Sequence, residues 1–102
     1  MPATEQAPLT YAAPALATIG AASTVVVAAS NTRELLVLVN NSDSDMYLGL
    51  GADAESTKGL CLKASGGVVQ FGGASGLPLW RGAVNAIAGG AGKVLSVQEA
   101  TV

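Results

Sequence analysis

The sequence predicts an all-β protein: an antiparallel β-sandwich or small barrel of about seven strands with an extended N-terminal arm. Short runs of apolar and β-branched residues recur roughly every 8–12 residues, separated by glycine, asparagine, aspartate and serine. No stretch repeats its apolar residues with the period of an amphipathic helix. A length of 102 residues fits one domain, which we assign to residues 17–102 after an arm of residues 1–16.

The expected arm is rich in proline and alanine. Each of its three prolines lacks an amide donor and favours an extended conformation in the preceding residue, so a continuous helix is not expected there. Termini of this composition are poorly ordered unless a surface holds them. We therefore expect the arm to contact a partner, with these candidate interface residues: Pro2, Pro8, Leu9, Tyr11, Pro14 and Leu16.

The first half of the domain predicts three strands. Residues 23–27 are mostly β-branched, and residues 34–39 are apolar on both faces, which places the second strand in the centre of a sheet. The run 40–45 consists of turn-forming residues and leads directly into the apolar run 46–50. The strands at 34–39 and 46–50 are therefore expected to pair as a hairpin.

The second half predicts four more strands, at residues 59–64, 68–71, 83–87 and 93–98. A glycine-rich loop at 72–78 separates the second of these from the third. The last strand alternates cleanly, with one side formed by Val94, Ser96 and Gln98 and the other by Leu95 and Val97.

The composition excludes most catalytic and metal chemistry. The chain has no histidine, which removes Ser-His-Asp and Cys-His pairs and histidine-ligated zinc. Cys61 is the single cysteine, so internal disulfides and iron–sulfur clusters are excluded. No two of the five Lys and Arg residues are adjacent, and seven Asp and Glu outnumber them, so no basic patch for nucleic acid is expected. We expect no enzymatic activity, no cofactor and no nucleic-acid partner.

Two local patterns resemble ligand loops but lack required residues. The run 89–94 resembles a phosphate loop, but Ile87 stands where that motif needs glycine, so a hairpin loop is expected. Residues 41–45 have the spacing that begins a calcium loop, but Met46 stands where that loop needs glycine, so a polar turn is expected. The acidic pair in 53–58 belongs to a polar run and is interpreted as part of a solvated loop.

Three further residues allow more than one interpretation. Cys61 alternates with two leucines and is expected to be half-buried and structural, because a reactive thiol needs a setting that lowers its pKa. Trp80 either anchors an interface or plugs the end of the core, and both interpretations stay open. Because Trp and Arg are enriched at binding hot spots, Trp80 and Arg81 join the candidate interface residues.

No membrane segment is expected. Residues 6–32 carry no charge, but Pro8, Pro14 and Gly20 interrupt them. Glu5 stands where a signal peptide needs basic residues, so we expect a soluble and unprocessed protein.

Only 12% of the residues are charged, about half the usual ~25%. A subunit covered by neighbours needs less surface charge than a free monomer, so this composition favours a homo-oligomer.

The order of segments resembles a known family, the small β-sandwich virion proteins of tailed bacteriophages, some of which decorate or cement the capsid. The resemblance covers roughly residues 19–100, and its most distinctive part is Asn40-Asn41-Ser42-Asp43 followed by Asp45 and Tyr47-Leu48-Gly49. The other matching segments are the strand at 35–39, the turn Gly66-Gly67 before Phe71, and the segments 82–87 and 93–99. The arm lies outside the matched stretch.

The resemblance implies a non-enzymatic virion protein, in the first instance a capsid decoration (cement) protein. Such a protein is made in the host cytoplasm and binds the outer head surface. Its expected partners are the major capsid protein and further copies of itself, with a trimer favoured and a dimer as the alternative. The second hypothesis is a fibre, head-fibre or tail component that recognises a host surface through the exposed loops at 53–58 and 74–81.

Overall fold

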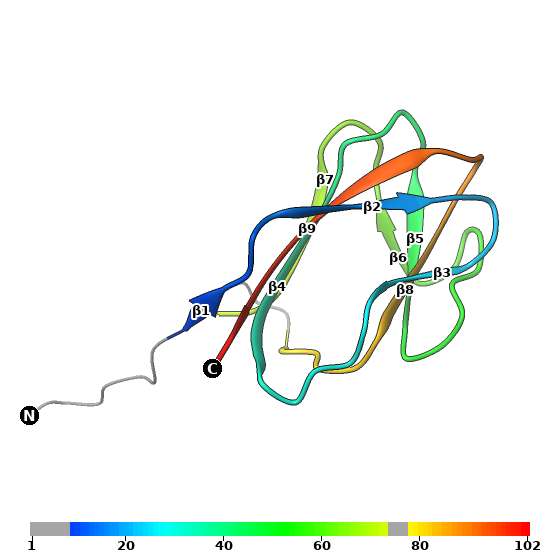
Figure 1. Ribbon diagram of the computed structural model, residues 1–102. Coiled ribbons are helices and arrows are strands. Elements are labelled where there is room, and N and C mark those ends of the chain that lie inside the picture. Colours follow the sequence, from blue (N-terminus) through cyan, green and yellow to red (C-terminus); the bar gives the residue numbers. More distant parts are fainter. Residues whose placement is uncertain (1–8, 74–77) are drawn as a thin grey trace, which may run out of the picture.

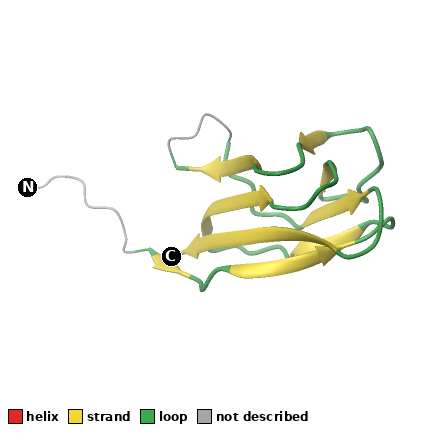
Figure 2. Ribbon diagram, turned by 90° about the horizontal axis from the view of Figure 1, so that it is seen from above, coloured by secondary structure: helices red, strands yellow, loops and turns green. Residues whose placement is uncertain are grey.

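The computed structural model describes residues 9–73 and 78–102 of the chain. These residues form strands and loops without a helix (Figures 1 and 2). The strands are β1 (Thr10–Tyr11), β2 (Ala15–Ile19), β3 (Thr24–Val27), β4 (Arg33–Asn40), β5 (Met46–Leu50), β6 (Leu60–Leu62), β7 (Gly67–Gly72), β8 (Val84–Ala88) and β9 (Lys93–Thr101).

The strands form two antiparallel sheets. In the first sheet, β9 pairs with β1 and β2 on one side and with β4 on the other, and β7 forms the far edge. The second sheet has the order β3-β8-β5-β6. The expected β-sandwich architecture is confirmed, whereas the closed barrel that the sequence also allowed is wrong, because the two sheets remain separate. The strand at 34–39 is central as expected, since β4 lies between β9 and β7.

The strand pairs are nested along the chain. β2 pairs with β9, β3 with β8, β4 with β7, and β5 with β6. These pairs are the ones expected if the chain first forms one long hairpin, with β2–β5 in its first half and β6–β9 in its second half. Wrapping that hairpin around itself then gives the two sheets. The eight strands β2–β9, four in each sheet, thus have the jelly-roll topology, and β1 adds a fifth strand to the first sheet.

The expected number of about seven strands was too low, since nine are present among the described residues. Both additional strands, β1 and β2, come from the region around Pro14, part of which was assigned to the extended arm. Prolines exclude a helix but are tolerated at a sheet edge, where outward amides need no partner. Pro14 lies between the two short strands, so both can pair with β9.

Both expected hairpin assignments were wrong. The run 40–45 joins β4 of the first sheet to β5 of the second, and the glycine-rich loop after β8 likewise crosses from the second sheet to the first. At the first crossing the buried side chain of Asn40 replaces backbone pairing. Its Nδ2 donates to the carbonyl oxygens of Ser44 (2.8 Å) and Leu62 (2.9 Å), and its Oδ1 accepts from the Ser42 hydroxyl (2.7 Å). These bonds connect the two sheets where the chain passes between them.

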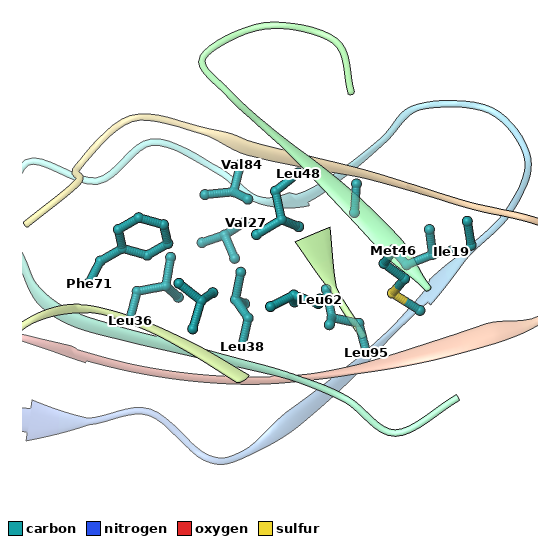
Figure 3. Packing of buried hydrophobic residues seen from close by; sticks show 13 residues of the cluster. Ile19, Val27, Leu36, Leu38, Met46, Leu48, Leu62, Phe71, Val84 and Leu95 are labelled. Carbon is teal, nitrogen blue, oxygen red and sulfur yellow. The ribbon is translucent and has the colours of Figure 1, made fainter. Parts of the chain in front are cut away.

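The core lies between the two sheets (Figure 3). Inward residues of the first sheet meet inward residues of the second, and most are aliphatic. The labelled members are Ile19, Leu36, Leu38, Phe71 and Leu95 from the first sheet, and Val27, Met46, Leu48, Leu62 and Val84 from the second. Since this contact uses one face of each sheet, the opposite faces point outward.

Candidate interaction surface

Most outward residues of the first sheet form three rows across its strands, and Thr18 with Val94 forms a shorter fourth row next to the first of them. The register aligns Leu16, Ser96, Val39 and Val68 as the first row, named here the Leu16 row. The second, the glutamine row, contains Gln98, Val37 and Gln70. The third, the Tyr11 row, contains Tyr11, Ala100, Leu35 and Gly72. Between them lie the buried residues of the core, so strand alternation directs all three rows outward, although Ala100 and Gly72 of the Tyr11 row are themselves buried.

This surface, called below the uncharged face, carries no Asp, Glu, Lys or Arg side chain. The described strands that form it contain four charged residues, and each is held elsewhere. Arg33 and Glu99 form an ion pair (2.9 Å) with the arginine fully buried. Glu34 pairs with Arg81 at one end of the sandwich, and Lys93 pairs with Asp43 (2.7 Å) at the other. Depletion of charge is the main compositional mark of an interface centre.

Large apolar side chains are exposed on the uncharged face. Leu16 is 71% exposed, and Tyr11 and Val68 are each 60% exposed. Leu16 and Val68 stand at opposite ends of one row, on the two edge regions of the sheet. The apolar exposure therefore extends across the whole width of the face.

Part of the outer face of the second sheet, around Gly49 and Asn85, is covered by the loop between β5 and β6. Asn85 donates through Nδ2 to the carbonyl oxygen of Ala52, and the amide of Ala54 donates to the Ser23 hydroxyl (2.8 Å). Gly49 lies beneath this loop, and a Cβ there would stand 2.6 Å from the oxygen of Ala52. The glycine therefore lets the loop approach the sheet closely.

A buried arginine fixes the end of the sandwich where β1 and the C-terminus lie (Figure 1). The Arg33 guanidinium donates to the carbonyl oxygens of Trp80 (3.1 Å), Gly82 (2.9 Å) and Ala28, in addition to Glu99. Burying a cation is costly unless its donors are satisfied, and here one carboxylate and three carbonyls accept from it. Arg33 thus joins two crossing segments to β4 and β9, and is interpreted as structural.

The two loop residues predicted for the interface lie in this same end region. Trp80 packs against the core, and its Nε1 donates to the carbonyl oxygen of Ala83 (3.0 Å), as expected if it plugs the end of the core. Arg81 donates through Nε to the carbonyl oxygen of Arg33 (2.9 Å) and pairs with Glu34. Both residues therefore already have partners within the subunit.

Of the arm residues predicted for the interface, the structure describes four. Leu9, Tyr11, Pro14 and Leu16 are all exposed, and Tyr11 and Leu16 belong to the uncharged face. The backbone after β1 is attached to β9, because the amide of Ala12 donates to the carbonyl oxygen of Glu99 (2.9 Å). Pro2 and Pro8 lie outside the described residues, as do residues 74–77 of the predicted recognition loop.

The two carboxylates of the polar turn at residues 41–45 form ion pairs with lysines. A hydrogen bond from Lys93 lowers the pKa of Asp43, and one from Lys63 (2.8 Å) lowers the pKa of Asp45. The amide of Ala64 also donates to Asp45 (2.8 Å). The turn therefore uses both carboxylates to tie neighbouring segments together.

Cys61 is exposed, so the expected half-buried position was wrong. Its strand β6 is the edge of the second sheet, and Cys61 occupies an outward position opposite Tyr47. The charge of Cys61 is the main cause that raises the pKa of Tyr47, followed by desolvation. The ion pair with Asp45 raises the pKa of Lys63, the next outward residue. These groups lie on the side of the sandwich opposite to the uncharged face.

The predicted loop at 53–58 is solvated, with an ion pair between Lys58 and Glu55 (3.2 Å). It borders an open hollow of about 320 Å³, which also reaches the backbone of β5. The floor is apolar, formed by Leu48, Leu50 and Leu60 with two glycines, while the rim carries Asp53, Glu55 and Lys58.

Searches for metal-binding clusters, membrane-spanning helices and similar proteins add no further candidate site in the described residues. Within residues 9–73 and 78–102, no three His, Cys, Asp or Glu side chains are grouped closely enough to hold a metal ion. The same residues contain no helix long and apolar enough to cross a membrane. No family model, curated protein or solved structure matches the chain.

The uncharged face is the feature that sequence reasoning missed. Its signal was partly visible, since Val94, Ser96 and Gln98 were expected on one side of the last strand and are confirmed there by the register. Recognising a face also requires knowledge of which strands lie next to each other in the sheet. Because β9 pairs with β2 and β4, which are distant in sequence, alternation within one strand could not reveal the rows.

Proposed function

We propose that this chain is a non-enzymatic structural protein of a tailed-phage virion, a capsid decoration (cement) protein that binds the outer head surface as a homo-oligomer and stabilises the shell. Its partners in this proposal are the major capsid protein and other copies of itself. The observation that carries the proposal is the uncharged face. The outward side of the first sheet carries no charged side chain and exposes Leu16, Tyr11 and Val68, which suits a subunit that functions among neighbours.

The exposed segment before β2 supports the same proposal. Leu9 and Tyr11 present apolar surface beside the uncharged face, and Pro14 restricts the backbone between β1 and β2. A proline-restricted segment loses less conformational entropy on docking than a flexible one. On a shell, many copies act together, so contacts that are individually weak still give stable attachment.

The test is co-sedimentation of the purified protein with heads of the virus that encodes it, after small proteins have been stripped from those heads. Saturation at a fixed ratio to the major capsid subunit is expected, together with increased resistance of the heads to heat. Binding of only a few copies per head, or none, contradicts the decoration role.

The hollow beside the loop at 53–58 favours a second candidate, a fibre, head-fibre or tail component that recognises a host surface. Its apolar floor and polar rim could accept part of a surface polymer. The described lining includes no aromatic platform of the kind that sugar sites commonly use. Saturable binding of the isolated protein to host cells, lost on Asp53→Ala with Glu55→Ala, would favour this candidate over decoration.

A further inference from the structure

We propose that the uncharged face is a self-association surface: it packs against the same face of a second copy about a two-fold axis. This inference deepens the proposed function, on which its biological meaning rests, by naming the surface through which copies associate. It also replaces the trimer implied by the family resemblance with a dimer as the basic unit, because a face that meets its own copy closes with two subunits.

The absence of charge on this face indicates which partner it binds. A partner that placed charged groups on this face would lose their hydration and find no counter-charge in return. The charged side chains nearest to it, Glu34 and Lys93, lie at its two ends and are already paired. The loop over the second sheet carries Asp53, Glu55 and Lys58, so that side of the molecule does not match. The surface of this chain that matches the uncharged face is the same face of another copy.

The three rows also have the symmetry that such a contact needs. Of the three rows, the glutamine row lies in the middle, with a mainly apolar row on each side, and the short Thr18–Val94 row lies beyond the Leu16 row. A two-fold axis along the middle row places the Leu16 row of one copy over the Tyr11 row of the other. Leu16 of one copy then lies over Tyr11 of the other, so two exposed apolar side chains meet near one edge of the face. Glutamine side chains meet glutamine side chains, whose amides are uncharged; within the subunit, Nε2 of Gln98 donates to the carbonyl oxygen of Ala12 and Nε2 of Gln70 to that of Gly72 (3.4 Å). Two sheets packed face to face in this way follow the usual aligned geometry.

The area of the uncharged face determines how strongly two copies associate. Four strands about 4.8 Å apart and three rows about 7 Å apart give roughly 400 Å² per copy. A standard stable interface buries about 800 Å² per partner, so the sheet face alone gives a weak dimer that dissociates on dilution. The exposed Leu9 lies next to β1 and can add apolar area at the margin.

The experiment measures the association of the purified full chain by sedimentation velocity over a wide dilution series. The test variants are Val68→Lys and Leu16→Lys, which each place a cation in the Leu16 row. Val25→Lys is the matched control, because Val25 is also a valine on an edge strand and is also 60% exposed, but belongs to the second sheet. Thermal melting of each variant confirms that it is folded.

A concentration-dependent dimer is expected for the wild-type chain and for Val25→Lys. Both test variants should raise the dissociation constant of the dimer roughly tenfold or more. The reason is that a lysine ammonium group buried without a partner costs at least as much free energy as a lost hydrogen bond. The proposal is overturned by a wild-type chain that stays monomeric throughout, by test variants that associate as the wild type does, or by equal weakening in Val25→Lys.

Head co-sedimentation of the same variants separates this proposal from the proposed function. A dimer that is lost in Val68→Lys, in a protein that never binds heads, supports the self-association surface and contradicts decoration. A monomeric wild type that binds heads only when Val68 and Leu16 are intact overturns the dimer and assigns the uncharged face to the shell.

Discussion

The two sheets are alike on the inside and different on the outside. Both contribute aliphatic side chains to one shared core, yet the β5–β6 loop covers the outer face of the second sheet around Gly49 and Asn85, while the outer face of the first sheet exposes Leu16, Tyr11 and Val68. The covered side carries charges in the covering loop, and the open side carries none. The difference is why the first sheet, and not the second, carries the proposed self-association surface.

The largest effect is expected from shortening the arm. Deletion of residues 1–13 removes β1 and its bonds to β9 but leaves β2 intact. We expect this variant to keep its cooperative melting and to lose detectable binding to stripped heads. Deletion of 1–16 would cut into β2 and is the poorer test. Wild-type head binding by the shorter variant would show that the open side functions without the arm.

Next in size is the contrast between inward and outward residues of one strand. Leu38 is fully buried and Val37 belongs to the glutamine row, although the two are adjacent in β4. Leu38→Ala should cost roughly 2–5 kcal/mol of unfolding free energy because it leaves a cavity in the core. Val37→Ala should cost about 1 kcal/mol or less, measured by denaturant unfolding at high dilution. Equal costs would contradict the division into an inner and an outer face.

Lifting the covering loop should have an intermediate effect. Gly49→Ala places a Cβ 2.6 Å from the oxygen of Ala52, so the loop must move, at a cost of roughly 1–3 kcal/mol. Gly20→Ala is the control, because nothing lies within 4 Å of its added Cβ, and its effect should stay within about 0.5 kcal/mol. Chemical denaturation of both variants measures the difference. If they are equally stable, the loop does not pack closely on the second sheet.

The smallest effect concerns the ion pairs at the margin of the sandwich. Because its hydrogen bond with Lys63 lowers the pKa of Asp45, this carboxylate stabilises the fold above its unfolded pKa, and the contribution is lost as pH falls through the lower folded value. Lys63→Ala should raise the midpoint of the Asp45 carboxyl titration, followed by NMR, towards the ordinary range. Lys58→Ala, which breaks the pair with Glu55, should leave that midpoint unchanged.

Local patterns predicted the strands better than their partners. The central position of 34–39 and the alternation of 93–98 followed from the residues alone, because burial on one or both faces leaves a direct mark in the sequence. Pairing leaves no such mark. The turn formers at 40–45 suggested a hairpin, whereas the inward side chain of Asn40 bonds the chain as it crosses between sheets.

The candidate surface was even less accessible to sequence reasoning. Tyr11 and Leu16 were selected as parts of an arm, but their place on the same face as Leu35 and Val39 depends on the distant β9. Cys61 looked half-buried because leucines flank it, and only its position on an edge strand makes it exposed. In each case, the decisive neighbour comes from a remote part of the chain.

The nested pairing has a consequence for the order of folding. The pair β5·β6 closes the shortest loop, and each pair outwards, to β2·β9, encloses all the earlier ones. Since loop-closure entropy grows with chain separation, we expect the chain to zip from the middle towards its ends. Pulse-labelled amide exchange during refolding should protect β5 and β6 first and β2 last, and simultaneous protection would contradict this order. The strand that completes the uncharged face would then be added at the end, so an unfinished subunit would have no complete surface with which to assemble.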